Sequence, residues 1–95
     1  MTGIGYALYE EMALKEDGRW IDSFTEYLLP TSQEFPKNYQ RIILEVPDES
    51  GPYGAKGIGE IPLVPTAPAI AAAVYDALGV RVNKLPIKPS DLVQV

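Results

Sequence analysis

The sequence predicts an α+β fold, with two main helices packed on a small mixed or antiparallel sheet. Two segments, residues 3–15 and the stretch between Thr66 and Gly79, carry apolar residues at helical spacing. Two others, residues 19–29 and 40–46, have the composition or the alternation of extended strands. The segments do not follow one another as βαβ units, which favours α+β over α/β. Ninety-five residues are enough for one domain.

The first predicted helix covers residues 3–15. Glu11 and Lys15 are spaced for an ion pair one turn apart. Gly3 and Gly5 either weaken the first turn or let it pass close to a neighbour. A tight turn is expected at 17–18, where the sequence is Asp-Gly. The apolar face consists of Ile4, Ala7, Leu8, Met12 and Leu14.

The extended segments follow this turn. Residues 19–29 are rich in aromatic and β-branched side chains and are expected to form one extended segment or one that breaks near Asp22 and Ser23. A loop is expected at 33–38. In residues 40–46, side chains alternate between two faces. One face holds Ile42, Leu44 and Val46, and the other holds Arg41, Ile43 and Glu45.

The second helix has clearer ends. Thr66 suits the N-cap, Pro68 is tolerated in the first turn, and Gly79 suits the position after the last helical residue. A short strand is expected at 80–82, and Ser90 or Asp91 begins a last helical turn. The apolar stripe consists of Ile70, Val74, Ala77 and Leu78.

Composition excludes several classes of function. A net charge of −5 with scattered basic residues argues against a nucleic-acid partner. The chain has no cysteine or histidine, which excludes a thiolate zinc site, a disulfide framework and a histidine-based triad. The apolar runs are shorter than the roughly 20 residues that span a bilayer, and no secretory segment is visible, so a cytoplasmic protein without membrane contact is expected.

Residues 51–62 form the most distinctive stretch, with four glycines in nine residues followed by Glu60. A Walker A loop is excluded because no serine or threonine follows Lys56. A dinucleotide fingerprint is excluded because Pro62 stands at its third glycine. From the residues alone, the stretch is either a plain surface turn with a solvated carboxylate or a loop whose amides bind a phosphate or small molecule.

The same stretch resembles a known family. Residues 54–63 (GAKGIGEIPL) and 65–70 (PTAPAI) are similar to the C-terminal part of the molybdenum-binding subunit of the xanthine dehydrogenase and aldehyde oxidoreductase family. Further similarity lies at 3–11 (GIGYALYEE), 27–31 (YLLPT) and 85–89 (LPIKP). The resemblance therefore spans nearly the whole chain, in order.

This resemblance implies that residues 1–95 are the C-terminal segment of a larger molybdopterin-binding domain. Glu60 is then the catalytic base, which takes a proton from a molybdenum-bound hydroxide that attacks an electron-poor carbon of an N-heterocycle or aldehyde. Electrons leave through iron–sulfur and flavin groups on other domains or subunits. The residues implied to line the cofactor are Ala55, Lys56, Gly57, Ile58 and Gly59.

Two departures from the family bear on what this chain does alone. Thr2 stands where the family usually has a glutamine that helps to hold the cofactor. The family's subunit is also many times longer. The isolated chain is therefore expected to retain no molybdopterin, to be inactive and to self-associate through uncovered surfaces. The alternative is a non-catalytic structural or interaction module derived from that fold, and the substrate is set largely by residues elsewhere.

Three further features have competing interpretations. Tyr53 faces the substrate side of the loop or packs, and Lys56 contacts an anionic group of the cofactor or faces solvent. The acidic residues near the first predicted helix form a metal cluster or, more commonly, an acidic solvated helix end. These residues are Glu10, Glu11, Glu16 and Asp17.

Overall fold

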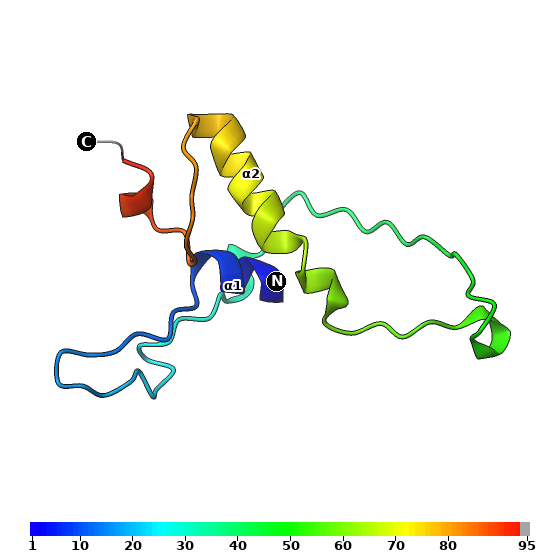
Figure 1. The fold of residues 1–95 in the computed structure, drawn as a ribbon, viewed down its shortest axis with the longest axis horizontal. Coiled ribbons are helices and arrows are strands. Elements are labelled where there is room, and N and C mark those ends of the chain that lie inside the picture. Colours follow the sequence, from blue (N-terminus) through cyan, green and yellow to red (C-terminus); the bar gives the residue numbers. More distant parts are fainter. Residues whose placement is uncertain (94–95) are drawn as a thin grey trace.

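Helices are the regular elements of residues 1–93, the part of the chain that the structure, a computed structural model, describes (Figure 1). Two are α-helices and four are short 3-10 helices. In chain order they are α1 (Thr2–Leu8), η1 (Ser32–Glu34), η2 (Pro52–Gly54), η3 (Ile61–Leu63), α2 (Thr66–Leu78) and η4 (Pro89–Asp91).

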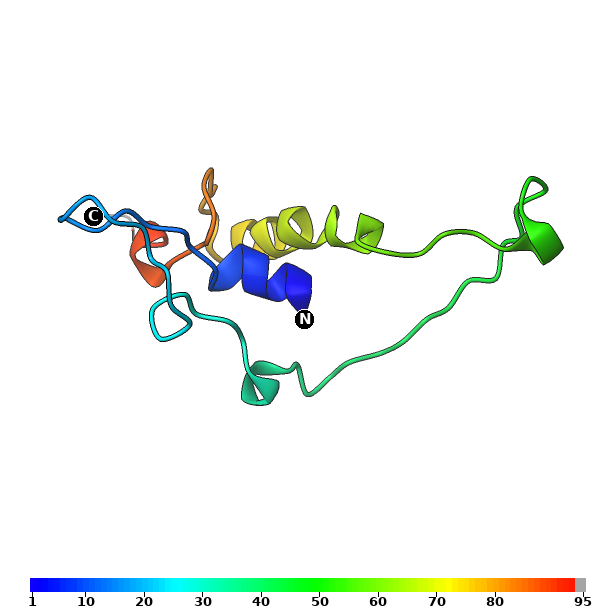
Figure 2. The same ribbon diagram turned by 90° about the horizontal axis from the view of Figure 1, so that it is seen from below.

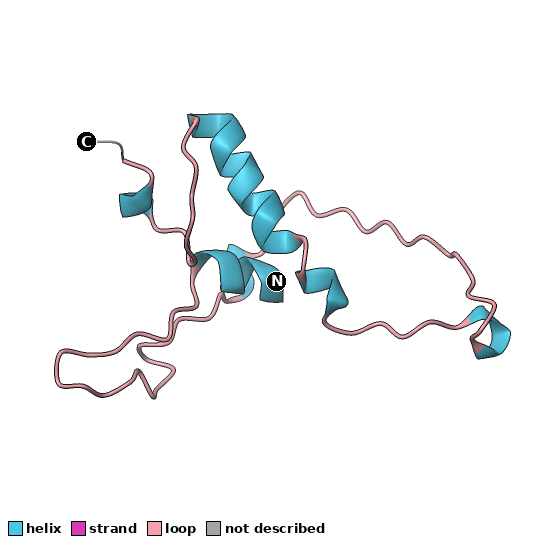
Figure 3. Cartoon of the chain, in the orientation of Figure 1, coloured by secondary structure: helices cyan, strands magenta, loops and turns pink. Residues whose placement is uncertain are grey.

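The predicted sheet is wrong, and with it the α+β fold class. Within residues 1–93 the only β contact is an isolated antiparallel bridge between Leu14 and Trp20. Figure 3 accordingly shows helices and loops but no strand arrows in the described chain. Residues 40–46 are extended but make no backbone hydrogen bond to the rest of residues 1–93. Alternating side chains indicate an extended segment with one face to bury, but a strand also needs a hydrogen-bonded neighbour.

Of the other two expected strands, the segment 19–29 breaks after Asp22, in agreement with the alternative given for it, and the strand at 80–82 does not form. In residues 19–29, Ser23 and Tyr27 close a turn, because the Tyr27 amide donates to the Ser23 carbonyl at 2.9 Å. Residues 80–82 are not helical and belong to no strand. The Asp-Gly turn is confirmed: Gly18 has a φ of +80°, and its amide donates to the Lys15 carbonyl at 3.0 Å.

Helix α1 ends seven residues earlier than predicted, at Leu8. The expected pair of Glu11 and Lys15 does not form, because Lys15 binds Glu26 at 2.7 Å and Glu11 binds Lys88 instead. A helix of one or two turns gains little from propensity, and two glycines lower it further. Tertiary partners of the segment after Leu8 therefore decide where the helix ends.

Helix α2 agrees closely with its prediction. Gly79 ends it in the left-handed conformation, with a φ of 70°, and its amide donates to the Tyr75 carbonyl at 2.8 Å. Its N-cap is Pro65, one residue before the predicted Thr66. The Thr66 hydroxyl donates to the Pro62 carbonyl at 3.3 Å, so it joins α2 to η3 rather than capping a free amide.

The two α-helices pack side by side at the centre of the molecule (Figures 1 and 2). A Cβ on Gly3 would lie 2.6 Å from the Thr66 side chain, and a Cβ on Gly5 would lie 2.5 Å from Glu10 Oε1. The glycines of α1 therefore allow a close approach, the second of the two roles expected for them. The buried apolar residues in the described chain are few: Ala7, Val80 and Ile87.

Two loops project from this centre. Residues 10–26 form a short one, and residues 36–60 form a long one that we call the arm; it carries η2 at its far end (Figures 1 and 2). The radius of gyration is 17.5 Å, whereas a compact domain of 100 residues has about 13 Å. The accessible surface is 8475 Å², against about 5,400 Å² for a compact protein of this size. The chain therefore leaves much surface that a compact protein would cover.

One apolar stretch in the described chain, Ile61–Leu78, could cross a membrane by length and composition, with a mean hydropathy of 1.4. Its α-helix has 13 residues and so covers about 20 Å of the roughly 30 Å of a hydrocarbon core. The preceding residues are the 3-10 helix η3, which contains Pro62, and the two turn residues Val64 and Pro65. The apolar surface of α2 is better explained as a packing surface.

Candidate functional site

The glycine-rich stretch lies at the end of the arm and along the limb that returns to η3 (Figure 1). A hydrogen-bonded turn holds the end of the arm. The Asp48 amide donates to the Gly54 carbonyl at 3.1 Å, and the Asp48 carboxylate accepts from both the amide and the hydroxyl of Ser50. These bonds to Ser50 hold the pKa of the Asp48 carboxyl below its usual value.

Two of the four glycines are required by this turn. A Cβ on Gly51 would lie 1.9 Å from the Ala55 carbonyl oxygen. Gly54 has a φ of +79°, and a Cβ there would lie 2.6 Å from the Cβ of Pro47. Contacts within the described chain therefore explain why both positions are glycine.

Contacts within the described chain do not explain the other two glycines, Gly57 and Gly59. At Gly57 and at Gly59, the space that a Cβ would occupy has no atom within 4 Å in the described chain, and neither φ lies in the left-handed region. None of the amides of residues 56–60 donates to a backbone carbonyl within residues 1–93. The limb thus presents a run of five amides without a backbone hydrogen bond in the described chain, which we call the open amides.

Tyr53 stands at the turn with a φ of 56° and a fully exposed ring. The left-handed conformation costs a residue other than glycine about 1 kcal/mol. The ring does not pack within the described chain, and both interpretations of Tyr53, a substrate-facing and a packing role, stay predictions. Sequence reasoning missed this conformation because tyrosine gives no signal for it.

Glu60 begins the next element. Its carbonyl accepts from the Leu63 amide at 2.9 Å, so its backbone belongs to the first turn of η3. Its side chain is exposed. The exposed Glu60 carboxylate is therefore accessible to a group outside this chain.

A hollow of about 580 Å³ lies between the two limbs of the arm. It brings together four of the five predicted cofactor-lining residues, namely Ala55, Lys56, Gly57 and Ile58. The opposite limb contributes Leu44, Glu45, Val46 and Pro47, which sequence reasoning had not connected with the site. Gly59 and Glu60 are not among the residues that line it.

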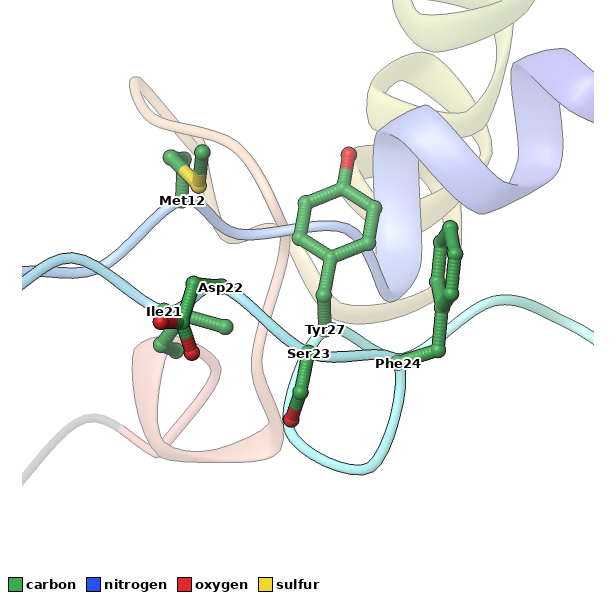
Figure 4. A pocket seen from close by; sticks show the side chains of 6 residues that line it. All are labelled: Met12, Ile21, Asp22, Ser23, Phe24 and Tyr27. Carbon is green, nitrogen blue, oxygen red and sulfur yellow. The ribbon is translucent and has the colours of Figure 1, made fainter.

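A second hollow, of about 230 Å³, lies at the base of the short loop (Figure 4). Its lining side chains point in different directions and are mostly apolar: Met12, Ile21, Asp22, Ser23, Phe24 and Tyr27. The Tyr27 hydroxyl donates to Glu10 at 2.7 Å, and this bond raises the pKa of Tyr27. No set of polar groups converges on the hollow, so it has the character of an uncovered packing surface.

The acidic residues near α1 do not form a metal site. No group of three or more potential ligands gathers anywhere in residues 1–93. Glu10 accepts from Tyr27, Glu11 pairs with Lys88, and Asp17 pairs with Arg19 at 2.9 Å. The residues also lie beyond the end of α1, so they are not the acidic helix end that was expected.

Comparison with known proteins gives close relatives. No protein-family model matches the chain. The chain is 43% identical over 95 residues to the 6-hydroxypseudooxynicotine dehydrogenase complex subunit gamma of Paenarthrobacter nicotinovorans, and the match covers 97% of this chain and 12% of that protein.

Two relatives from Escherichia coli (strain K12) are named as molybdenum-binding subunits. The putative xanthine dehydrogenase molybdenum-binding subunit XdhA is 35% identical over 94 residues, covering 97% of this chain and 12% of the relative. The aldehyde oxidoreductase molybdenum-binding subunit PaoC is 37% identical over 87 residues, covering 90% and 12%. The chain thus spans about 12% of the length of these relatives.

Proposed function

Since the homologues of this chain include molybdenum-binding subunits of the xanthine dehydrogenase and aldehyde oxidoreductase type, we propose that it is the C-terminal segment of such a subunit. In this proposal Glu60 is the catalytic base. The limb before it, from Ala55 to Gly59, lies against the molybdopterin cofactor. The reaction is the hydroxylation of an N-heterocycle or an aldehyde.

The observation that carries the proposal is the run of open amides next to Glu60. Gly57 and Gly59 have no role that the described chain explains, and glycine is typical of places where a backbone must approach another group closely. Successive free amides bind anionic and polar groups well. A pterin cofactor presents such groups, so the residues present fit it.

The residues of the limb after Ala55 then have specific tasks. The open amides of residues 56–60 donate hydrogen bonds to the cofactor, and the Lys56 ammonium pairs with an anionic group on it. Because Gly57 and Gly59 have no side chain, the backbone of the limb can lie close to the cofactor. When bound, molybdopterin supplies the oxygen-transfer and two-electron chemistry of the reaction.

Glu60 supplies the proton transfer. A carboxylate accepts a proton at one oxygen and can hold it while the substrate reacts, provided that the carboxylate lies within hydrogen-bond distance of the donor. The first turn of η3 fixes the Glu60 backbone directly after the glycine limb. In the proposal, the Glu60 carboxylate reaches the group that the limb binds.

The chain supplies only one wall of this site. Glu60 and most of the limb are exposed, so the opposite walls come from the remainder of the molybdenum-binding subunit. Iron–sulfur and flavin groups on partner subunits or domains accept the electrons. The large uncovered surface supports this arrangement.

Replacement of Glu60 by glutamine in the assembled enzyme tests the proposal. Glu60→Gln keeps the shape but removes the basic oxygen, so turnover is expected to fall by about 10²- to 10⁴-fold, the usual contribution of a general base. Molybdenum content is expected to stay at the wild-type level. Glu49→Gln is the matched control, since it makes the same change of charge on an exposed residue of the same arm. Normal turnover of Glu60→Gln would instead favour the non-catalytic structural module.

A further inference from the structure

We propose that residues 40–46 of the arm are the segment by which this chain docks on the remainder of the molybdenum-binding subunit. The segment docks in extended form, with backbone hydrogen bonds to the remainder. It buries the face of Ile42, Leu44 and Val46. This inference rests on the proposed function for the identity of the partner.

The backbone of the segment is the first observation. Neither the amides nor the carbonyls of residues 36–47 take part in a backbone hydrogen bond within residues 1–93. An extended segment with a free row of donors and acceptors is a template for pairing with another chain segment. Extended peptides commonly bind in this way, with affinity from the main chain and specificity from alternate side chains.

The side chains indicate which face of the segment is buried on docking. Ile42, Leu44 and Val46 share one face of the extended segment, and all three are exposed here, at 79%, 81% and 61%. The opposite face carries one apolar residue, Ile43, between the charged Arg41 and Glu45. A row of three exposed apolar side chains is the face that gains most from being covered.

The extent of the uncovered surface indicates a large partner. The chain exposes about 3,000 Å² more than a compact protein of its size would. A standard protein–protein interface takes only about 800 Å² from each partner. The relatives carry the similar stretch within chains of which it forms 12%, so the remainder of such a subunit is large enough to cover this surface.

Docking of this segment would also place the candidate site. The segment leads through Pro47 into the hydrogen-bonded turn, which in turn holds Gly54 and Ala55. Leu44 and Val46 line the same hollow as Ala55 to Ile58. If residues 40–46 are held by docking, the turn and the limb that carries the open amides are held with them.

Amide hydrogen exchange tests the docking directly in the assembled molybdenum-binding subunit. We expect amides within residues 42–46 to exchange at least 100-fold more slowly in the assembly than in this chain alone, because hydrogen-bonded amides exchange only on opening. Exchange at the free rate in the assembly would overturn the proposal. The free rate in the assembly together with protection in the chain alone that grows with its concentration would identify a second copy as the partner instead.

A pair of variants tests the face. Leu44 and Ile43 are equally exposed in this chain, at 81% and 84%. Leu44→Asp is expected to reduce the yield of assembled subunit at least tenfold, whereas Ile43→Asp is expected to reduce it less than threefold. Equal effects would overturn the assignment of the buried face.

The outcome is separable from that of the proposed function. Glu60→Gln should leave the exchange protection of residues 42–46 unchanged whether or not Glu60 is the base. Loss of turnover in that variant without any protection of the segment would support the catalytic role and contradict the docking. Protection of the segment with full turnover would support the docking and contradict the catalytic role.

Discussion

At the scale of single residues, the glycines of the arm divide into two kinds. Gly51 and Gly54 serve the turn, because side chains there would collide with Ala55 and Pro47. Gly57 and Gly59 face open space in the described chain. The first kind is explained by the structure of this chain, and the second kind by what the chain binds in our proposal.

Alanine substitutions distinguish the two kinds. Gly57→Ala should leave the turn intact but lower the molybdenum content of the assembled subunit several-fold, because its methyl group occupies space next to the cofactor. Gly54→Ala should instead weaken the turn by about 1–2 kcal/mol, the cost of a left-handed alanine. Metal analysis, with amide exchange of residues 48–55 as the measure of the turn, checks both. Full molybdenum content in Gly57→Ala would contradict the role given to the limb.

Asp48 gives the turn a pH dependence. The Ser50 hydroxyl and amide lower the pKa of its carboxyl, so the ionised form is favoured in the folded turn. The stabilisation of the turn by the ionised Asp48 carboxyl is complete above its unfolded pKa of about 3.9. It is lost as the pH falls through the lower pKa of the folded turn. Ser50→Ala should raise the pKa of Asp48 toward its usual value. A titration of the Asp48 carboxyl carbon by NMR measures the shift, and an unchanged pKa would contradict the assigned cause.

At the scale of elements, α2 could be predicted from the sequence because its ends carry local signals. Gly79 needs the left-handed conformation that ends the helix, and the apolar stripe has helical spacing. The prediction for α1 was too long because spacing alone does not report the contacts of Glu10 and Glu11 beyond Leu8. The end of a short helix depends on tertiary contacts, which the sequence pattern does not contain.

The predicted sheet failed for a related reason. The alternation in residues 40–46 correctly indicates an extended segment, but pairing needs a second segment at hydrogen-bond distance. The described chain offers none. An alternating pattern cannot show whether its partner belongs to the same chain.

The contact between α1 and α2 is itself testable. Gly3→Ala places a methyl group 2.6 Å from the Thr66 side chain, so the helices must separate. Such overpacking typically costs about 1–3 kcal/mol. We expect faster amide exchange in the first two turns of α2, and slower or equal exchange would contradict the packing. Gly59→Ala is the matched control, because its methyl group meets nothing in the described chain.

At the scale of the whole molecule, the chain has a small centre and a long arm. Few apolar side chains are buried in the described residues, and the arm that carries the candidate site has little support from the rest of the chain. The sequence singles out the glycine loop and Glu60 through a family resemblance, and their roles stay predictions. It could not predict that the site would project from the molecule, because that follows from packing. The expected cytoplasmic location stays a prediction.

This architecture leads to a prediction for the isolated chain. One exposed wall holds a cofactor weakly, because its hydrogen bonds compete with water. The purified chain should therefore contain far less than one molybdenum per chain and show no hydroxylation. Metal analysis and an activity assay check this, and stoichiometric molybdenum would contradict it.

In the proposed function, Glu60 takes the proton in the chemical step. The most direct test is the rate at which substrate reduces the assembled enzyme in a single turnover, compared between wild type and Glu60→Gln at equal molybdenum content. This rate is expected to fall by at least about 100-fold in the variant. A rate equal to that of the wild type would contradict it.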